Sequence, residues 1–179
     1  MRRIARFYKV SFQRFCEDWM DIFGGQADAQ AIRQDKEIQE IYQDIRLPQR
    51  ATRGSAGYDF YAPMEIILAP GEGIKVPTGI RAEMDEGWVL TCYPRSGLGF
   101  KYRMQLDNTV GVIDSDYFYS DNEGHILAKI TNDSQEGRAL TIHAGTGFMQ
   151  GIFLEYGITV DDGAEAVRNG GLGSTTGRS

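Results

Sequence analysis

A short stretch of the chain combines a carboxylate and an aromatic ring at a spacing that suits chemistry on a bound ligand. Residues 108–117 read Asn-Thr-Val-Gly-Val-Ile-Asp-Ser-Asp-Tyr, so a β-branched run ends at Asp114 and Tyr117 follows three residues later. A carboxylate at such a place can take a proton from water as a general base. The competing interpretation is structural, because an Asp after a strand commonly caps backbone N–H groups in a turn. The stretch by itself predicts a hairpin, in which Gly111 marks a bulge or a close approach of a ligand to the backbone.

A second stretch offers groups that suit phosphate oxygens. Residues 93–99 read Tyr-Pro-Arg-Ser-Gly-Leu-Gly. Arg95 supplies a charged fork, Ser96 a hydroxyl, and Gly97 an accessible backbone N–H. An ordinary glycine-rich turn is an equally good interpretation of these residues.

Three further segments carry polar groups. Asp59 lies in Ser-Ala-Gly-Tyr-Asp-Phe and is either structural or holds the water shell of a hard cation such as Mg²⁺. Gln150 lies between apolar residues in Gly-Thr-Gly-Phe-Met-Gln-Gly. The tail 168–177 is glycine-rich and could close over bound phosphates, although composition alone favours a low-complexity tail.

These segments form a coherent site if a phosphate chain lies along the second stretch and a nucleoside along the first. Asp114 would then hold a water molecule aimed at phosphorus. The ring of Tyr117 would pack flat against the sugar and leave no room for a 2′-hydroxyl, which favours deoxyribose. Asn108 carries both an amide donor and an acceptor, and so suits the edge of a pyrimidine.

Composition indicates one domain with an extension. The chain has 179 residues, a formal net charge of −6, 22 Gly and five Pro, which favours a β body rich in turns. Its basic residues are dispersed along the sequence, which argues against a nucleic-acid polymer as partner. Cys16 and Cys92 form no CxxC pair, so reduced thiols in a cytoplasmic protein are expected, with a disulfide left open. Neither a membrane span nor an apolar signal core is present, so no membrane partner is expected.

The first part of the chain predicts a helical extension. Residues 3–10 suggest a short strand. Ser11 suits the N-cap of a helix over 12–23 that Gly24 ends, and residues 26–45 carry apolar side chains at helical spacing. This extension is expected to pack on the main body or on a sister subunit, and a separate binding function is the alternative.

From residue 47 onward the pattern changes to short β runs broken by turn residues. We expect strands at 58–61, 64–68, 73–76, 79–83, 88–93, 104–106, 109–113, 125–131, 140–143 and 151–156. This pattern predicts a mainly β barrel or double-sheet sandwich. The expected organisation is an N-terminal strand and helical extension (1–46), a β domain (47–158) and a flexible C-terminal arm (159–179).

Taken in order, the segments resemble the five motifs of the trimeric dUTPase family, over roughly residues 47–177. The motifs read Ala-Gly-Tyr-Asp, Pro-Arg-Ser-Gly-Leu, Asn-x-x-Gly-Val-Ile-Asp-x-Asp-Tyr, the Gln-bearing segment and Gly-Gly-Leu-Gly-Ser-Thr. The resemblance implies a jelly-roll-like β-barrel or sandwich of the β-clip type. It also implies Mg²⁺-assisted hydrolysis of dUTP to dUMP and pyrophosphate, in a homotrimer whose sites are shared between subunits and closed by a swapped tail.

The resemblance also implies a role for each matching residue. Asp114 matches the general base that activates the attacking water, and Asp59 matches a residue that reaches Mg²⁺ through water. The metal itself is chelated mainly by the triphosphate. The residues expected to bind the base and sugar are Asn108, Gly111, Ile113, Tyr117 and Leu172. The residues expected to bind phosphate are Arg95, Ser96, Gly97, Gln150, Arg168, Gly173 and Ser174.

The chain departs from the family pattern at several places. Leu172 stands where many members have a Phe that stacks on uracil, which keeps apolar cover and removes the stacking. Arg168 lies one residue nearer the glycines than is common, Thr176 is an extra residue, and Gly147 and Met149 replace a common basic and a common small residue. About five extra residues at 118–122 lengthen the loop after Tyr117, and the helical extension is additional.

Other activities fit less well. The dCTP deaminases share the fold but need a glutamate after the Ile-Asp turn, where this chain reads Ser-Asp-Tyr. A zinc deaminase site would need His-x-Glu and CxxC partners, which His125 and His143 lack, so both are expected to be ordinary strand residues. A dUTPase-like fold used as a nucleotide-gated binding protein, with weak or no turnover, is the alternative that sequence leaves open.

Overall fold

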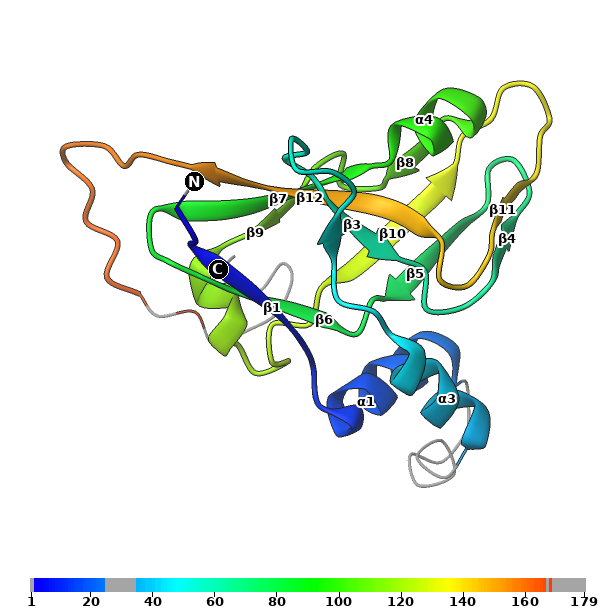
Figure 1. Ribbon diagram of the computed structural model, residues 1–179, viewed down its shortest axis with the longest axis horizontal. Helices are drawn as coiled ribbons and strands as arrows, with labels where there is room; N and C mark the ends of the chain where they lie inside the picture. The colour runs from blue at the N-terminus through cyan, green and yellow to red at the C-terminus, as the bar shows by residue number, and fades with distance from the viewer. Residues whose placement is uncertain (1, 25–34, 167, 169–179) are drawn as a thin grey trace, which may run out of the picture.

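The chain folds into antiparallel sheets with two helices packed at one end (Figure 1). This computed structural model describes residues 2–24, 35–166 and 168. The helices are α1 (Phe12–Phe23), α3 (Lys36–Asp44) and α4 (Ser96–Tyr102), and η1 (Ser115–Tyr119) is a 3₁₀ turn. No helix in the described part of the chain is long and apolar enough to cross a membrane.

The largest sheet carries the candidate site residues. Its strand order is β2-β3-β12-β7-β9, and β7 lies near its centre. The bounds are β2 (Gln49–Arg50), β3 (Tyr58–Tyr61), β12 (Gly147–Glu155), β7 (Trp88–Pro94) and β9 (Gly111–Ile113). Strand β12 pairs with β3 on one side and with β7 on the other, so it joins the first two motifs of the sequence through the fourth.

Three smaller sheets complete the body. One pairs β1 with β6, one has the order β5-β10-β8, and one pairs β11 with β4. The bounds are β1 (Ala5–Lys9), β6 (Ile80–Met84), β5 (Gly73–Pro77), β10 (Leu127–Asn132), β8 (Met104–Leu106), β11 (Leu140–Ile142) and β4 (Ile66–Leu68). The mainly β prediction is confirmed. A closed barrel is not observed, because in the described residues these sheets do not close on themselves.

The core lies between the sheets and depends on one close glycine contact. Phe60, Leu90 and Phe148 are fully buried, as expected for inward positions of alternating strands. Gly151 lies among them, and a Cβ there would come within 2.8 Å of Leu90 and 2.9 Å of Phe60. Any larger residue at position 151 would therefore displace a core side chain.

Three sequence expectations about strands are wrong. The stretch 108–117 does not form a hairpin, because β9 is followed by the 3₁₀ turn η1 and pairs with β7. Thr109 is not in a strand, since its φ of 64° places it in the left-handed region of a turn. Strand β12 also begins at Gly147, four residues before the expected start, so the glycine-rich fourth motif is strand rather than loop.

Helix α1 forms over the expected residues. The side chain of Ser11 accepts a hydrogen bond from the N–H of Arg14, and Gly24 closes the last turn. Helix α3 is shorter than expected and begins after Asp35, whose carboxylate caps it. Residues 26–34 of the predicted second helical segment lie outside the described residues.

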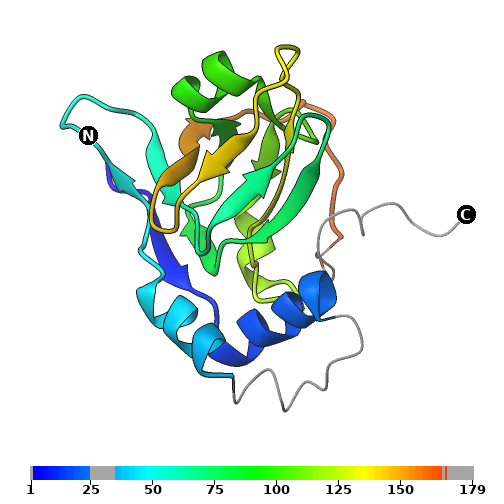
Figure 2. The same ribbon diagram turned by 90° about the vertical axis from the view of Figure 1, so that its right-hand side faces the viewer.

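The two helices pack on each other and on the body (Figure 2). Tyr42 of α3 stacks near Phe12 and Phe15 of α1, with ring centroids 5.2 and 5.6 Å away. Its hydroxyl donates to the carbonyl of Val10 at 2.7 Å. Asp18 of α1 accepts a hydrogen bond from the buried ring of His125. The expected packing of the extension on the main body is therefore present within one chain.

The basic residues are less dispersed than the sequence suggests. A cleft of about 870 Å³ is lined by aromatic and arginine side chains. Its arginines are Arg2, Arg3, Arg6, Arg50 and Arg53.

Cys16 and Cys92 are buried thiols and not a disulfide, as expected.

Acidification should weaken the contact between the helical extension and the body. Burial lowers the pKa of His125 below its ordinary value of 6.5, although the hydrogen bond to Asp18 opposes this. The unfolded chain therefore binds a proton here before the folded chain does, and stability present above pH 6.5 is lost as the pH falls. The pKa values of Asp18 and Glu123 are also lowered; burial opposes this, but hydrogen bonds to His125 and Ser11 outweigh it. These carboxylates extend the loss to lower pH.

Urea unfolding at about pH 8, 6.5 and 5 measures this loss. A single proton accounts for a slope of up to about 1.4 kcal/mol per pH unit. The variant His125→Gln should have a flatter slope below pH 6.5. His143→Gln is the matched control, because the side chain of His143 is 77% exposed. An unchanged slope in His125→Gln would contradict the assignment.

Candidate active site

Asp114 stands at the end of β9, where the chain turns into η1. It occupies the N-cap position, yet its side chain makes no capping hydrogen bond. Its carboxylate instead accepts a hydrogen bond from the guanidinium of Arg168. The structural alternative, a carboxylate that caps the turn, is therefore not what the structure shows.

Arg168 joins two carboxylates of this turn. Its Nη2 donates to Asp114, and its Nε donates to Asp116 at 3.0 Å. The same guanidinium lies 5.8 Å from the ring centroid of Tyr117, within range of a cation–π contact. Sequence predicts that Arg168 binds phosphate, and the structure places it beside the carboxylates and the ring.

Tyr117 is buried, and two hydrogen bonds hold its hydroxyl. Only 2% of the residue is exposed. Its hydroxyl donates to the carbonyl of His125 at 2.8 Å and accepts from Nδ2 of Asn122 at 2.8 Å. Burial raises the pKa of this phenol, so the ring is neutral at physiological pH. A neutral ring of fixed orientation is suited to act as a wall against a sugar.

The remaining residues predicted to bind the base lie on the turn before β9 and in β9 itself. Asn108 is exposed, and its Nδ2 is 3.8 Å from the position that a Cβ on Gly111 would take. A Cβ on Gly111 would also lie 3.1 Å from the Cβ of Cys92, so glycine keeps β9 close to β7. Ile113 is 5% exposed and packs in the core, which leaves its backbone as the part able to face a ligand.

Asp59 and Gln150 lie on the neighbouring strands β3 and β12, and Arg95 lies beside them on the turn after β7. The Nε of Arg95 lies 3.3 Å from Oδ1 of Asp59. Gln150 is opposite Asp59 in the register of β3 and β12. Two glycines make room for these side chains: a Cβ on Gly147 would lie 2.8 Å from Nη1 of Arg95, and one on Gly57 would lie 2.6 Å from Oε1 of Gln150. The departure at Gly147 therefore has a physical reason.

Ser96 and Gly97 open a short helix rather than a glycine-rich turn. Arg95 is the N-cap of α4, and its carbonyl accepts the N–H groups of Leu98 and Gly99 at 3.0 Å each. The first N–H groups of a helix have no acceptor within the helix. Ser96 and Gly97 therefore present backbone donors, and Gly97 has open space where a side chain would be.

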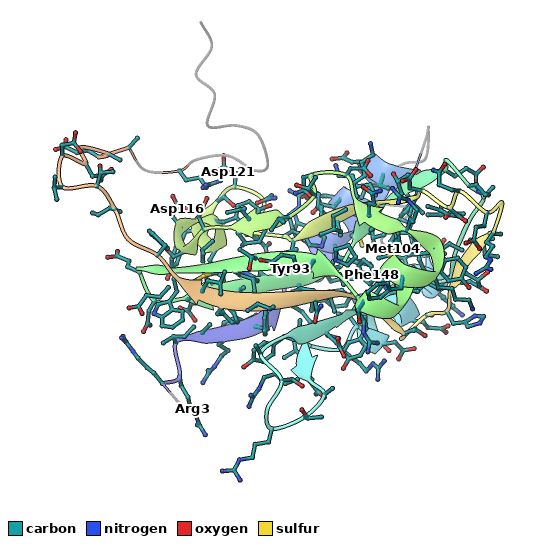
Figure 3. All side chains as sticks on the ribbon, turned by 90° about the horizontal axis from the view of Figure 1, so that it is seen from above. Arg3, Tyr93, Met104, Asp116, Asp121 and Phe148 are labelled. Atoms are coloured by element: carbon teal, nitrogen blue, oxygen red, sulfur yellow. The ribbon has the colours of Figure 1, made fainter. Side chains whose placement is uncertain are left out.

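These two groups of residues lie far apart in one chain. Strands β7 and β9 are antiparallel, with Ile113 opposite Leu90 and Gly111 opposite Cys92. Arg95 lies beyond the other end of this pairing, six residues past the position opposite Asp114. At the rise of a strand, this corresponds to about 20 Å. Figure 3 shows the same separation, with Asp116 well to one side of Tyr93 and Phe148.

A family model for dUTPase matches residues 43–176. This chain belongs to the dUTPase family. The helix α1 lies outside the matched range, in agreement with the expectation that the helical extension is additional.

Curated and structural relatives agree with this family. A deoxyuridine 5′-triphosphate nucleotidohydrolase of Lactococcus lactis is 42% identical over 136 residues, which cover 73% of this chain and 88% of the relative. The crystal structure of a dUTPase from Streptococcus mutans is 37% identical, with a TM-score of 0.57, over 65% of this chain and 89% of that chain. A dUTPase of Staphylococcus bacteriophage 80alpha, solved with dUPNHPP, shares the fold at 17% identity and a TM-score of 0.61, over 92% and 90% of the chains.

The donors present in this dUTPase chain do not form a metal cage. Among the described residues, no group of three His, Cys, Asp or Glu side chains could hold an ion. Asp59, the carboxylate predicted to reach the ion through water, is already paired with Arg95. This arrangement fits an ion held mainly by phosphate oxygens and water, as Mg²⁺ commonly is.

Sequence reasoning missed the residues that hold Tyr117. His125 was expected to be an ordinary strand residue, yet it precedes β10 and contacts both Asp18 and Tyr117. The predicted tail residues Leu172, Gly173 and Ser174 lie outside the described residues.

Proposed function

We propose that this chain hydrolyses dUTP to dUMP and pyrophosphate, with Asp114 as the general base. One observation carries the assignment. Asp114 is held at the end of β9 with its carboxylate off the backbone, beside the fixed ring of Tyr117 and the cation of Arg168. A base, a sugar wall and a counter-charge for phosphate are thus in one place.

In the proposed reaction, water attacks the α-phosphorus of dUTP. Asp114 takes a proton from this water as the new P–O bond forms. The bond between the α-phosphorus and the bridging oxygen to the β-phosphorus breaks, and pyrophosphate leaves with the electron pair. Mg²⁺ bound to the triphosphate would supply charge neutralisation and orientation, with Asp59 contacting it through water.

Selectivity for deoxyuridine is assigned to the turn before β9, to β9 itself and to η1. The ring of Tyr117 excludes a 2′-hydroxyl by contact with the sugar. Asn108 and the backbone at Gly111 and Ile113 read the uracil edge, and Leu172 covers the base. Phosphate oxygens are assigned to Arg95, Ser96, Gly97, Gln150, Arg168, Gly173 and Ser174.

The separation within one chain supports a shared site in a homotrimer. Asp114 and Arg95 are about 20 Å apart in one chain. This distance is longer than the triphosphate group of one bound nucleotide can bridge. A site that uses both residues therefore takes them from different copies. Two surfaces suit such an assembly. Among the described residues β1 pairs only with β6, so its other edge is available beside the arginine-lined cleft. The arm exposes Ile158 and Val160 next to acidic residues.

Such a composite site would act in the cytoplasm, where the buried thiols of Cys16 and Cys92 stay reduced.

Pyrophosphate release from dUTP, dCTP, dTTP and UTP, with and without Mg²⁺, tests this function. We expect rapid Mg²⁺-dependent release from dUTP and much slower release from the other three. Negligible release from dUTP would contradict the proposal and support the nucleotide-gated binding protein instead.

A further inference from the structure

The buried side chain of His125 connects the helical extension to the body. Its Nε2 accepts the N–H of Gly79 at 2.8 Å, so this nitrogen carries no proton. The proton therefore lies on Nδ1, which is 2.5 Å from Oδ2 of Asp18. Asp18 is also held by Arg14, whose Nε and Nη2 lie 3.1 and 2.8 Å from its oxygens. The tautomer of His125 follows from these partners.

The same histidine holds the ring of Tyr117 through its backbone. Its carbonyl accepts the hydroxyl of Tyr117 at 2.8 Å. Asn122 donates to that hydroxyl from the other side, and its Oδ1 accepts from Ser120 and from the N–H of Gly124. The position of His125 therefore sets the position of the hydroxyl end of the ring.

Helix α1 contacts the loop after Tyr117 at a second point. The N–H and hydroxyl of Ser11 donate to the carboxylate of Glu123 at 2.8 and 2.6 Å. Arg81 contacts the same loop, because its Nη2 donates to the carbonyl of Phe118 at 2.6 Å. The loop is thus held from α1 through both Ser11 and Asp18.

The two regions expected to depart from the family pattern are α1 and residues 118–122, and α1 and its N-cap contact Glu123 and His125 just after those residues. The lengthened loop follows Tyr117, and α1 lies outside the residues that the family model matches. A longer loop has more conformations to lose, and contacts to α1 restrict them. Displacement of a substrate-contacting group by about 1 Å can change turnover by about a hundredfold.

We propose that Asp18 and His125 are positioning residues for Tyr117, through which the inserted helix α1 maintains the preference for deoxyribose over ribose. This inference rests on the proposed function, in which the Tyr117 ring contacts the sugar. The residues act through Tyr117 and do not touch the nucleotide themselves.

The ratio of kcat/KM for dUTP to that for UTP tests this proposal. Asp18→Ala removes the carboxylate that holds His125, so we expect this ratio to fall at least about tenfold. Ile38→Ala is the matched control, because Ile38 is a buried residue of α3. This substitution should lower the Tm, and the apolar side chain of Ile38 can make no hydrogen bond to His125. An unchanged ratio in Asp18→Ala, or an equal fall in Ile38→Ala, would overturn the proposal.

Two variants of Tyr117 complete the test. Tyr117→Phe keeps the ring and removes only the hydroxyl, which donates a hydrogen bond to the carbonyl of His125. This variant should also lower the ratio, and it provides a test if Asp18→Ala fails to fold. Tyr117→Ala removes the ring. If Tyr117→Ala left the ratio unchanged, the sugar assignment in the proposed function would fail. If Tyr117→Ala lowered the ratio while Tyr117→Phe and a folded Asp18→Ala kept it, only the positioning role would fail.

Discussion

The variant Asp114→Asn should bind dUTP normally and turn it over about 10²- to 10⁴-fold more slowly than the unmodified chain. Asparagine has nearly the same shape as aspartate, and its amide oxygen can still accept the hydrogen bond that Asp114 receives from Arg168. An amide cannot accept the proton of the attacking water. The loss should therefore appear in kcat, with the dissociation constant for dUTP little changed.

Asp116→Asn is the matched control for this variant. Asp116 lies two residues away in η1 and also accepts a hydrogen bond from Arg168, at 3.0 Å. It has the same chemistry but no assigned role in proton transfer, so its turnover should stay close to that of the unmodified chain. Normal pyrophosphate release by Asp114→Asn, or equal losses in both variants, would remove Asp114 from the role of base.

Local signals in the sequence predict the elements that hold the site. Helix α1 occupies its expected residues because Ser11 and Gly24 are strong start and stop signals. The alternation of residues 58–61 and 104–106 predicts β3 and β8 to the residue. Alternation does not identify the partner of a strand, however, and for this reason the expected hairpin at residues 108–117 is wrong.

The fourth motif shows why glycine can mislead a sequence-based prediction. Gly147 lies four residues before the start of the expected strand 151–156, yet both Gly147 and Gly151 lie in β12. Each is there because a neighbour occupies the space of a side chain, Arg95 in one case and Leu90 with Phe60 in the other. These steric requirements come from residues elsewhere in the chain, so the local sequence pattern does not reveal them.

Some residues of the candidate site can be recognised from sequence, and others cannot. Its motifs are short and contiguous, so Asp114, Tyr117 and Arg95 are recognisable from sequence. The support of Tyr117 is not, since Asp18 and His125 are 107 residues apart and neither lies in a motif. The position of Arg168 beside Asp114 also depends on the path of the arm, which sequence spacing does not define.

Substitution of Arg95 should lower turnover as much as substitution of Asp114. Subunits that carry one substitution should restore activity when they assemble with subunits that carry the other. Arg95→Gln removes the guanidinium assigned to phosphate and keeps a polar side chain of similar reach. We expect the homotrimer of this variant to be nearly inactive. Because Asp114 and Arg95 are about 20 Å apart in one chain, a mixed trimer can still place an intact Asp114 from one copy next to an intact Arg95 from another.

Random mixing of the two variants makes this prediction quantitative. Each site takes its carboxylate from one copy and its arginine from a neighbour, so roughly a quarter of all sites are intact in equal mixtures. Mixing Asp114→Asn with Tyr117→Ala is the control, since both residues belong to the same half of the site. That mixture should show no activity above that of its parents.

Pyrophosphate release by equal, co-refolded mixtures of Asp114→Asn and Arg95→Gln is thus the most direct test of a site built from two copies. We expect recovery to roughly a quarter of the activity of the unmodified protein, from parents that are each nearly inactive. Activity no higher than that of the parents would show that Asp114 and Arg95 serve the same site from one chain, and would contradict the account.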